Sequence, residues 1–140
     1  MEFKADALVL RTADWGEYDK IVTLFTAERG KLSAALKGVK RAGAKLKFAA
    51  QPFCFAEFVF VEKAGRHTVI SAYLHDGFYA LREDIACYYA AVVLCEACDQ
   101  LLFEGIESPT LFLAAVRTLE ALSSCAEGGA TDAAGGRLED

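Results

Sequence analysis

The residues with the clearest chemical potential are the basic side chains between Arg29 and Lys47. Seven of the 15 lysines and arginines lie in this short segment, and no acidic residue occurs between Glu28 and Glu57. The seven are Arg29, Lys31, Lys37, Lys40, Arg41, Lys45 and Lys47. Flexible cationic side chains neutralise nucleic-acid phosphates and release counterions, so the segment favours binding to a phosphate backbone. The alternative is a solvated strand edge and loop, whose lysines discourage edge-to-edge pairing.

Exposed aromatic rings would strengthen such a surface, because nucleic-acid bases of any sequence can stack on them. Trp15, in a polar turn beside Gly16, is the best candidate for an exposed ring. Phe48, close to Lys45 and Lys47, is the second candidate. The alternative for both rings is packing in the core, which is the default for most of the sixteen aromatic residues.

The segment Gly38–Lys45 is similar to a phosphate-binding P-loop but departs from it at the reactive positions. A P-loop places lysine directly after the second glycine, followed by serine or threonine for the metal. Here an alanine precedes Lys45, and Leu46 takes the metal-binding place. His67 and His75 lie in ordinary strand patterns, and no nucleophile has an adjacent base. The sequence therefore predicts neither an enzyme nor a bound cofactor.

The cysteines raise a metal or redox alternative. Cys95 and Cys98 have the Cys-x2-Cys spacing of zinc ribbons, but structural zinc takes four ligands, and redox chemistry needs a thiol of lowered pKa. The pair lies within an apolar helical pattern, which indicates buried thiols. Five cysteines without a secretory signal do not suggest a disulfide framework. We therefore predict free core thiols and no metal site.

The elements that would position these residues begin with a small β-barrel over residues 5–76. Alternating, β-branched and aromatic runs predict five short strands with short connections, which favours a closed barrel over a parallel sheet. The expected strands cover 5–12, 19–26, 31–37, 53–62 and 66–75. The glycine-containing stretch 38–50 is predicted to be a loop, so the basic segment is divided between a strand and this loop.

Beyond the strands, apolar residues recur from Leu81 onward at spacings of three and four, which is the helical period. They are Leu81, Ile85, Tyr88, Val92 and Cys95. One helix is expected to end near Gly105, and Ser108 and Pro109 provide the N-cap and first residue of a second. The acidic, Gly/Ala-rich end has no periodicity and predicts a loose tail. We therefore expect an α+β chain with a barrel at 1–76, a helical region at 77–125 and a flexible tail at 126–140.

Charge divides the chain at the same boundary. Residues 1–76 carry 12 basic and 9 acidic side chains, net +3, whereas residues 77–140 carry 3 and 11, net −8. The overall charge of −5 excludes a uniformly basic nucleic-acid binder but allows a local basic patch. No apolar run approaches the roughly 20 residues of a membrane span, and the N-terminus lacks a signal core. We expect a cytoplasmic protein without a membrane partner.

The first 55 residues contain a series of short motifs, in the order Ala7–Arg11, Gly16–Thr26, Gly30–Leu32, Lys37–Gly38 and Gln51–Phe53. This ordered series resembles the N-terminal region of the RecO family of bacterial recombination and DNA-repair proteins. The resemblance implies an oligonucleotide/oligosaccharide-binding (OB) barrel, in agreement with the five-strand pattern. It also implies binding of single- and double-stranded DNA, strand annealing, and cooperation with RecR and single-stranded-DNA-binding protein to load RecA, at the bacterial nucleoid.

By position, the family's basic barrel residues correspond best to Lys37 and Arg41. The remaining candidates for DNA binding follow from local composition and are Lys31, Lys40, Lys45, Lys47, Arg29 and Trp15. Members of the family usually continue well beyond 140 residues, with a four-cysteine zinc-type module to which Cys95 and Cys98 are not assigned. We therefore expect a truncated or shortened member. The predicted function is a non-enzymatic DNA-binding module of a recombination mediator, and the alternative is a protein-interaction adaptor that works through its acidic helices.

Overall fold

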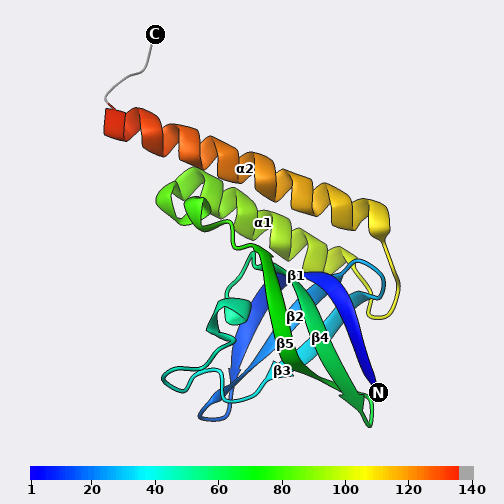
Figure 1. The fold of residues 1–140 in the computed structure, drawn as a ribbon. Helices are drawn as coiled ribbons and strands as arrows, with labels where there is room; N and C mark the ends of the chain where they lie inside the picture. The colour runs from blue at the N-terminus through cyan, green and yellow to red at the C-terminus, as the bar shows by residue number, and fades with distance from the viewer. Residues whose placement is uncertain (136–140) are drawn as a thin grey trace.

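The computed structural model describes residues 1–135, with side chains as far as residue 128, and consists of a β-barrel followed by two long helices (Figure 1). The strands are β1 (Glu2–Trp15), β2 (Asp19–Thr26), β3 (Gly30–Leu36), β4 (Phe55–Lys63) and β5 (Arg66–Asp76). The helices are α1 (Ile85–Leu101) and α2 (Pro109–Gly135), with short 3-10 turns η1 (Lys47–Ala50) and η2 (Tyr79–Glu83).

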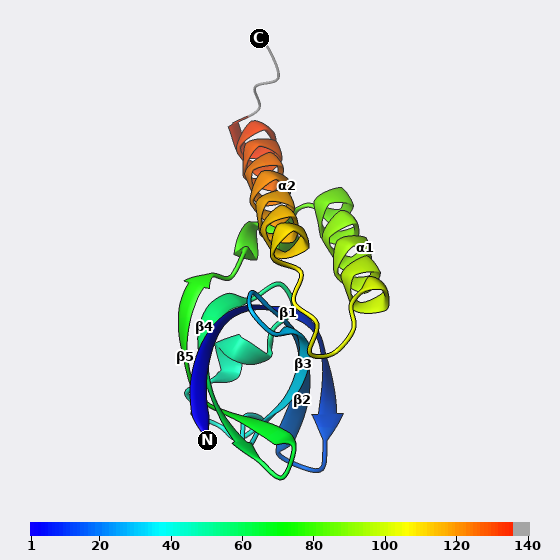
Figure 2. The ribbon, with the colours of Figure 1, turned by 90° about the vertical axis from the view of Figure 1, so that its right-hand side faces the viewer.

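The five strands close into a barrel in the order β1-β2-β3-β5-β4, which confirms the predicted α+β fold with an OB-type barrel (Figure 2). β1 pairs with both β2 and β4, and an irregularity between Val9 and Arg11 lets this long strand curve around the barrel. The seam between β3 and β5 is narrow, because a single parallel pair, Ala35 with Thr68, joins the two strands. The barrel is therefore least tightly paired along this seam.

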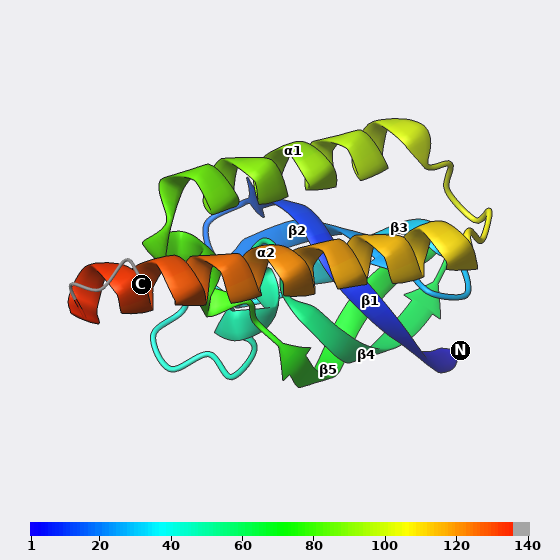
Figure 3. The same ribbon diagram turned by 90° about the horizontal axis from the view of Figure 1, so that it is seen from above.

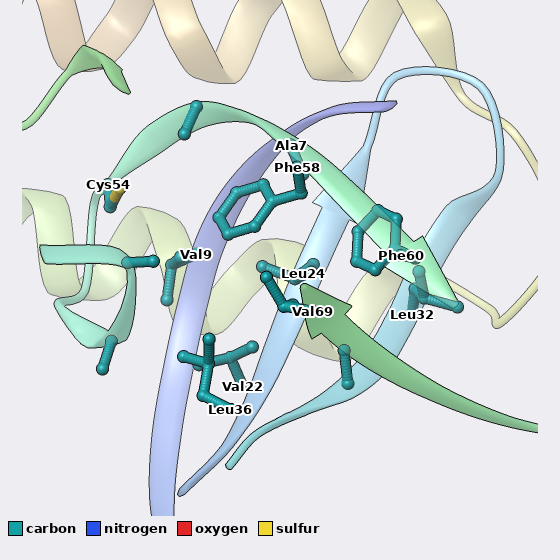
Figure 4. Packing of buried hydrophobic residues seen from close by; sticks show 14 of the residues in the cluster. Ala7, Val9, Val22, Leu24, Leu32, Leu36, Cys54, Phe58, Phe60 and Val69 are labelled. Carbon is teal, nitrogen blue, oxygen red and sulfur yellow. The ribbon is translucent and has the colours of Figure 1, made fainter. Parts of the chain in front are cut away.

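Side chains that alternate along the strands fill the barrel interior (Figure 4). Val22, Leu24, Phe58 and Phe60 point into it and are fully buried. Outward side chains of β1 and β2 are buried as well where they lie under the helices: Phe25 meets Phe112 of α2 edge to face at 5.3 Å. This second layer also includes Phe53, which precedes β4, and Phe55, its first residue, whereas the later outward residues of β4 are half-buried or exposed.

The two helices lie side by side across one side of the barrel (Figures 1 and 3). α2 starts at Pro109, as predicted. α1 starts later than the apolar period suggested, because residues 79–83 form the η2 turn first. The Asp84 carboxylate then accepts a hydrogen bond from the Cys87 N–H at 3.0 Å and caps α1. Asp84, inside the predicted helix, is therefore its N-cap.

The end of the chain differs from the predicted tail. α2 continues as far as Gly135, and Ala126, where the tail was expected to begin, is fully buried. Alanine is the strongest helix former, so an Ala-rich stretch attached to a packed helix can continue it despite its glycines. The remaining tail residues, 136–140, lie outside the described residues. Within residues 1–135, no helix is long and apolar enough to cross a membrane.

Candidate nucleic-acid interface

The basic loop after β3 is fastened to the turn between β1 and β2. The Lys40 N–H donates to the Tyr18 carbonyl oxygen at 2.9 Å, and the Gly38 N–H donates to the Asp19 carboxylate at 2.7 Å. The Arg41 guanidinium stacks on Tyr18, 3.8 Å from the ring centroid. These contacts hold the cationic loop at the end of the barrel that lies away from the helices (Figure 1).

A hollow of about 750 Å³ lies beside this loop, along the β3–β5 seam. Its basic side chains come from separate elements: Lys37 follows β3, whereas Lys63 and Arg66 flank the tight β4–β5 turn. Among the described residues, none of these three cations forms an ion pair. OB-folds bind oligonucleotides on the face between the β1–β2 and β4–β5 loops, which is where this hollow lies.

Trp15 lines the same hollow from the end of β1, and its side chain is 62% exposed. Of the two candidate rings, Trp15 is therefore exposed, and the alternative of core packing does not hold for it. Phe48, the second candidate, is half-buried and packs against the barrel core, so it is not free to stack on a base. The hollow thus combines one available indole with three unpaired cations. We refer to Trp15, Lys37, Lys63 and Arg66 as the groove.

The structure divides the predicted basic residues into two groups. Lys31, at the start of β3, donates to the backbone oxygen of Asp99 at 2.8 Å and pairs with its carboxylate at 3.2 Å. Arg29, two residues earlier, stacks on Phe3 with its guanidinium 3.6 Å from the ring centroid. At about 3.3 Å per strand residue, Lys31 and Lys37 are separated by roughly 20 Å. Arg29 and Lys31 therefore do not join the groove, and Lys31 instead attaches the barrel to α1.

The other predicted cations lie in the segment that follows β3 and do not line the groove. Lys45 is exposed on the loop, and Lys47 starts η1. Lys40 and Lys20 both pair with the carboxylate of Asp14, at 3.0 and 3.7 Å respectively. The hydrogen bond and charge of Lys40 are the main reason that the pKa of Asp14 is lowered below its ordinary value of 3.8. Asp14 is therefore a carboxylate anion within the basic region.

Local composition did not identify Lys20, Lys63 or Arg66. These residues are separated in sequence from the basic segment; Lys20 and Lys63 each follow an acidic residue, and Arg66 follows a glycine. The available signal was topological, because the predicted turn at 63–65 joins the last two strands of a barrel that resembles an OB-fold. Ligands of such barrels bind beside this loop, so its two basic residues were detectable candidates.

Three of the five cysteines, Cys54, Cys95 and Cys98, are buried thiols as predicted, whereas Cys87 is half-buried and Cys125 is exposed. Cys95 and Cys98 are buried between α1 and the rest of the second layer. Burial raises the pKa of Cys95 to about 12, and it does the same for Cys54 inside the barrel. Both thiols therefore stay protonated and unreactive near neutral pH. Within the part of the chain that the structure describes, no group of three or more His, Cys, Asp and Glu residues could hold a metal ion.

Comparison with known proteins agrees with this geometry. The family model described as "Recombination protein O N terminal" matches residues 1–78, which include all five strands. A protein named DNA repair protein RecO from Exiguobacterium sibiricum is 38% identical over 119 residues, covering 85% of this chain and 48% of the relative. Its namesake from Syntrophomonas wolfei is 33% identical over 123 residues, covering 88% of this chain and 48% of the relative.

A third relative, DNA repair protein RecO from Heliobacterium modesticaldum, is 38% identical over 99 residues, covering 71% of this chain and 36% of the relative. The chain spans about half the length, or less, of these curated relatives. The similarity extends beyond the barrel into the helical region, since the longer matches cover more than the 78 residues of the family model. The barrel, the ordered motifs and these relatives together show that this chain belongs to the RecO family.

Proposed function

We propose that this chain is a DNA-binding module of the DNA-repair and recombination machinery, and that it holds DNA in the groove without catalysing a reaction. The observation that carries the proposal is the convergence of Trp15, Lys37, Lys63 and Arg66 on one hollow of an OB-type barrel. The curated relatives carry the name DNA repair protein RecO, which supports the repair role.

The groove has the chemistry that a single strand requires. Lys37, Lys63 and Arg66 can each neutralise a phosphate, which attracts any sequence equally because phosphates carry no base information. The exposed indole of Trp15 can stack on a base, an interaction that contributes about 1–3 kcal/mol per base. The acidic second half of the chain, net −8, would repel DNA from the helices. DNA is therefore favoured at the barrel end that lies away from them.

The resemblance to the family extends the proposal to annealing of complementary strands. It also extends to double-stranded DNA and to cooperation with RecR, single-stranded-DNA-binding protein and RecA. A groove that contacts phosphates and leaves base edges free would suit annealing, since the bases must remain able to pair. These activities are proposed for the chain as part of a recombination mediator.

Fluorescence anisotropy with a labelled single strand of mixed sequence tests the DNA-binding proposal. Three phosphate contacts predict a log–log salt slope of about −2 for single-stranded DNA. The double variant Lys37→Glu/Arg66→Glu should bind DNA at least roughly tenfold more weakly, which corresponds to a loss of about 1.4 kcal/mol of binding free energy. The control is Arg117→Glu, which reverses the charge of an exposed residue of α2, away from the groove. This variant should bind DNA like the parent. Equal binding by the double variant and the parent would place DNA elsewhere.

A second candidate function, a protein-interaction adaptor, is favoured by the outer face of α1. Ile85, Tyr89 and Val93 recur every four residues and are 74%, 60% and 63% exposed. Monomeric proteins rarely leave a continuous apolar strip of this kind uncovered, so the strip indicates a binding surface. The sequence predicted acidic helices as the working surface, whereas the structure points to this apolar strip.

The adaptor candidate can be separated from the DNA-binding one by a variant in the strip. Ile85→Glu/Val93→Glu should weaken retention of purified RecR or single-stranded-DNA-binding protein and leave DNA affinity unchanged. Both side chains are mostly exposed, so the fold should tolerate the substitutions. If neither partner is retained by the parent chain, the adaptor candidate is wrong.

A further inference from the structure

A second basic hollow, of about 290 Å³, is lined by other residues of the same loop and by its neighbours. Lys20 of β2, Lys40 of the loop and Lys47 of η1 all line it. The amide side chain of Gln51 is also part of the lining and can donate a hydrogen bond. Three lysines from separate segments thus line one space, and the ammonium groups of Lys20 and Lys40 both lie within 4 Å of the Asp14 carboxylate. Like charges that are close repel each other, which makes this space attractive to an anion.

In the free protein, the anion at the edge of this cluster is Asp14. Its carboxylate lies 3.0 Å from the Lys40 ammonium and 3.7 Å from that of Lys20. The Asp14 side chain is 61% exposed, and ion pairs at such exposed positions contribute little to stability because water screens them. The carboxylate can therefore be exchanged for another anion at small cost in free energy.

The loop does not depend on Asp14 for its position. Its backbone bonds, from Lys40 N–H to the Tyr18 oxygen and from Gly38 N–H to Asp19, remain when Asp14 is removed. Replacing Asp14 should therefore release two ammonium groups without releasing the loop that carries one of them. The Asp14 variant therefore tests the role of Asp14 as a counter-ion without removing the hydrogen bonds that support the loop.

We infer that Lys20, Lys40 and Lys47 form a phosphate-binding site and that Asp14 is the carboxylate that a phosphate displaces. The inference rests on the proposed function, because the phosphate would belong to the DNA strand held in the groove. Trp15, which lines the groove, is the next residue after Asp14, so the groove and this carboxylate lie at the same end of β1. Asp14 is then an affinity-determining residue that weakens DNA binding.

Asp14→Asn should therefore bind single-stranded DNA more tightly than the parent. The substitution frees the Lys20 and Lys40 ammonium groups and removes a negative charge from the path of the phosphates. If two more phosphates are then neutralised, the log–log salt slope should steepen by about 1.4. We expect a gain of at least threefold in affinity at low salt, and this gain should shrink as salt is added because added salt screens the new contacts.

Asp6→Asn is the matched control, since Asp6 is another partly exposed aspartate of β1 but pairs with His75, away from the loop. Anisotropy with a labelled single strand should show the gain for Asp14→Asn and not for Asp6→Asn. Adding Lys40→Gln and Lys47→Gln to the Asp14→Asn variant should abolish the gain. Equal affinities for the two aspartate variants, or weaker binding by Asp14→Asn, would overturn the inference while leaving DNA binding by the parent intact.

Free phosphate compounds present the same chemistry, so a calorimetric titration with pyrophosphate at constant ionic strength is the second arm. We expect the Asp14→Asn variant to bind pyrophosphate with lower affinity than it binds DNA. We also expect pyrophosphate to compete with DNA for the site. If pyrophosphate binds and no variant binds DNA, the hollow takes a free anion and the DNA proposal fails. If neither ligand binds any variant, both the phosphate site and the DNA-binding function are wrong.

Discussion

Replacing Asp99 with alanine should loosen the attachment of the helices to the barrel. Asp99 lies near the end of α1, where its carboxylate is bound by cations from two strands. Arg11 of β1 donates through Nε at 2.8 Å, and Lys31 of β3 pairs with the other oxygen at 3.2 Å. We call these three residues the Asp99 clamp. It is the set of ion pairs that joins the barrel to α1 among the described residues.

The expected loss follows from the burial of each contact. In the variant, Lys31 keeps the backbone oxygen of residue 99 as an acceptor, at 2.8 Å, so only its carboxylate contact disappears. Arg11 is mostly exposed, and such a pair contributes roughly 0.5 kcal/mol. The contact of Lys31 with the largely buried carboxylate is worth about 1.5 kcal/mol as a hydrogen bond between charged groups. Together these give about 2 kcal/mol, or a decrease in Tm of roughly 6 °C for a domain of this size.

The pH dependence provides an independent check. Burial alone would raise the pKa of Asp99, but the hydrogen bonds and charges of Arg11 and Lys31 lower it below the ordinary value of 3.8. A carboxyl group whose pKa is lowered by folding stabilises the protein above its unfolded pKa, and this contribution is lost as the pH falls through the folded pKa. The difference in unfolding free energy between parent and variant should therefore be largest at neutral pH and should shrink as the pH falls below 3.8.

Urea unfolding followed by circular dichroism, at neutral pH and at a pH below the carboxyl pKa, measures both quantities. Asp6→Ala is the control, because its pair with His75 is exposed and should contribute less than about 0.5 kcal/mol. A variant within about 0.5 kcal/mol of the parent at neutral pH would refute the clamp, since independent surface substitutions have effects of that size. A difference that stays constant on acidification would show that packing, and not charge, is responsible.

Two further predictions concern close packing and thiol burial. Gly30→Ala should destabilise the chain by at least about 3 kcal/mol in thermal unfolding, because the new Cβ would lie 2.1 Å from the Ile106 carbonyl oxygen. Gly43→Ala, with a similar positive φ but no atom within 4 Å, should cost only the roughly 1–2 kcal/mol of left-handed strain. A thiol reagent should modify exposed Cys125 in the native protein, whereas Cys54 and Cys95, whose pKa values burial raises to about 12, should react only in denaturant. Peptide mass spectrometry distinguishes these sites, and rapid native labelling of Cys95 would contradict its place in the core.

Periodicity alone was sufficient for most of the architecture. All five strands and the start of α2 at Pro109 were predicted, because alternation and N-cap signals act over a few residues. The start of α1 was misplaced, since apolar spacing continues through η2 and the capping role of Asp84 depends on local backbone geometry. The tail was misassigned over 126–135 because composition does not show that Ala126 is buried.

The site was only partly predictable. Sequence reasoning identified Lys37 and Trp15, which lie in the groove, because their residue types and their place in a barrel of this family are local properties. It grouped Arg29 and Lys31 with them, since residues adjacent in sequence were assumed to share a surface. β3 instead separates its two ends by several residues of extended chain, and α1 supplies a carboxylate for Lys31 at one end.

The sequence by itself thus determined the five strands, the existence of the two long helices, the family and the presence of a basic segment. Tertiary structure alone decided which cations act together. Closure of the barrel between β3 and β5 brings Lys37 beside Lys63 and Arg66, and the β1–β2 turn brings Asp14 to Lys40. The physical reason is that charges interact through space over a few ångströms, whereas sequence patterns report only neighbours along the chain.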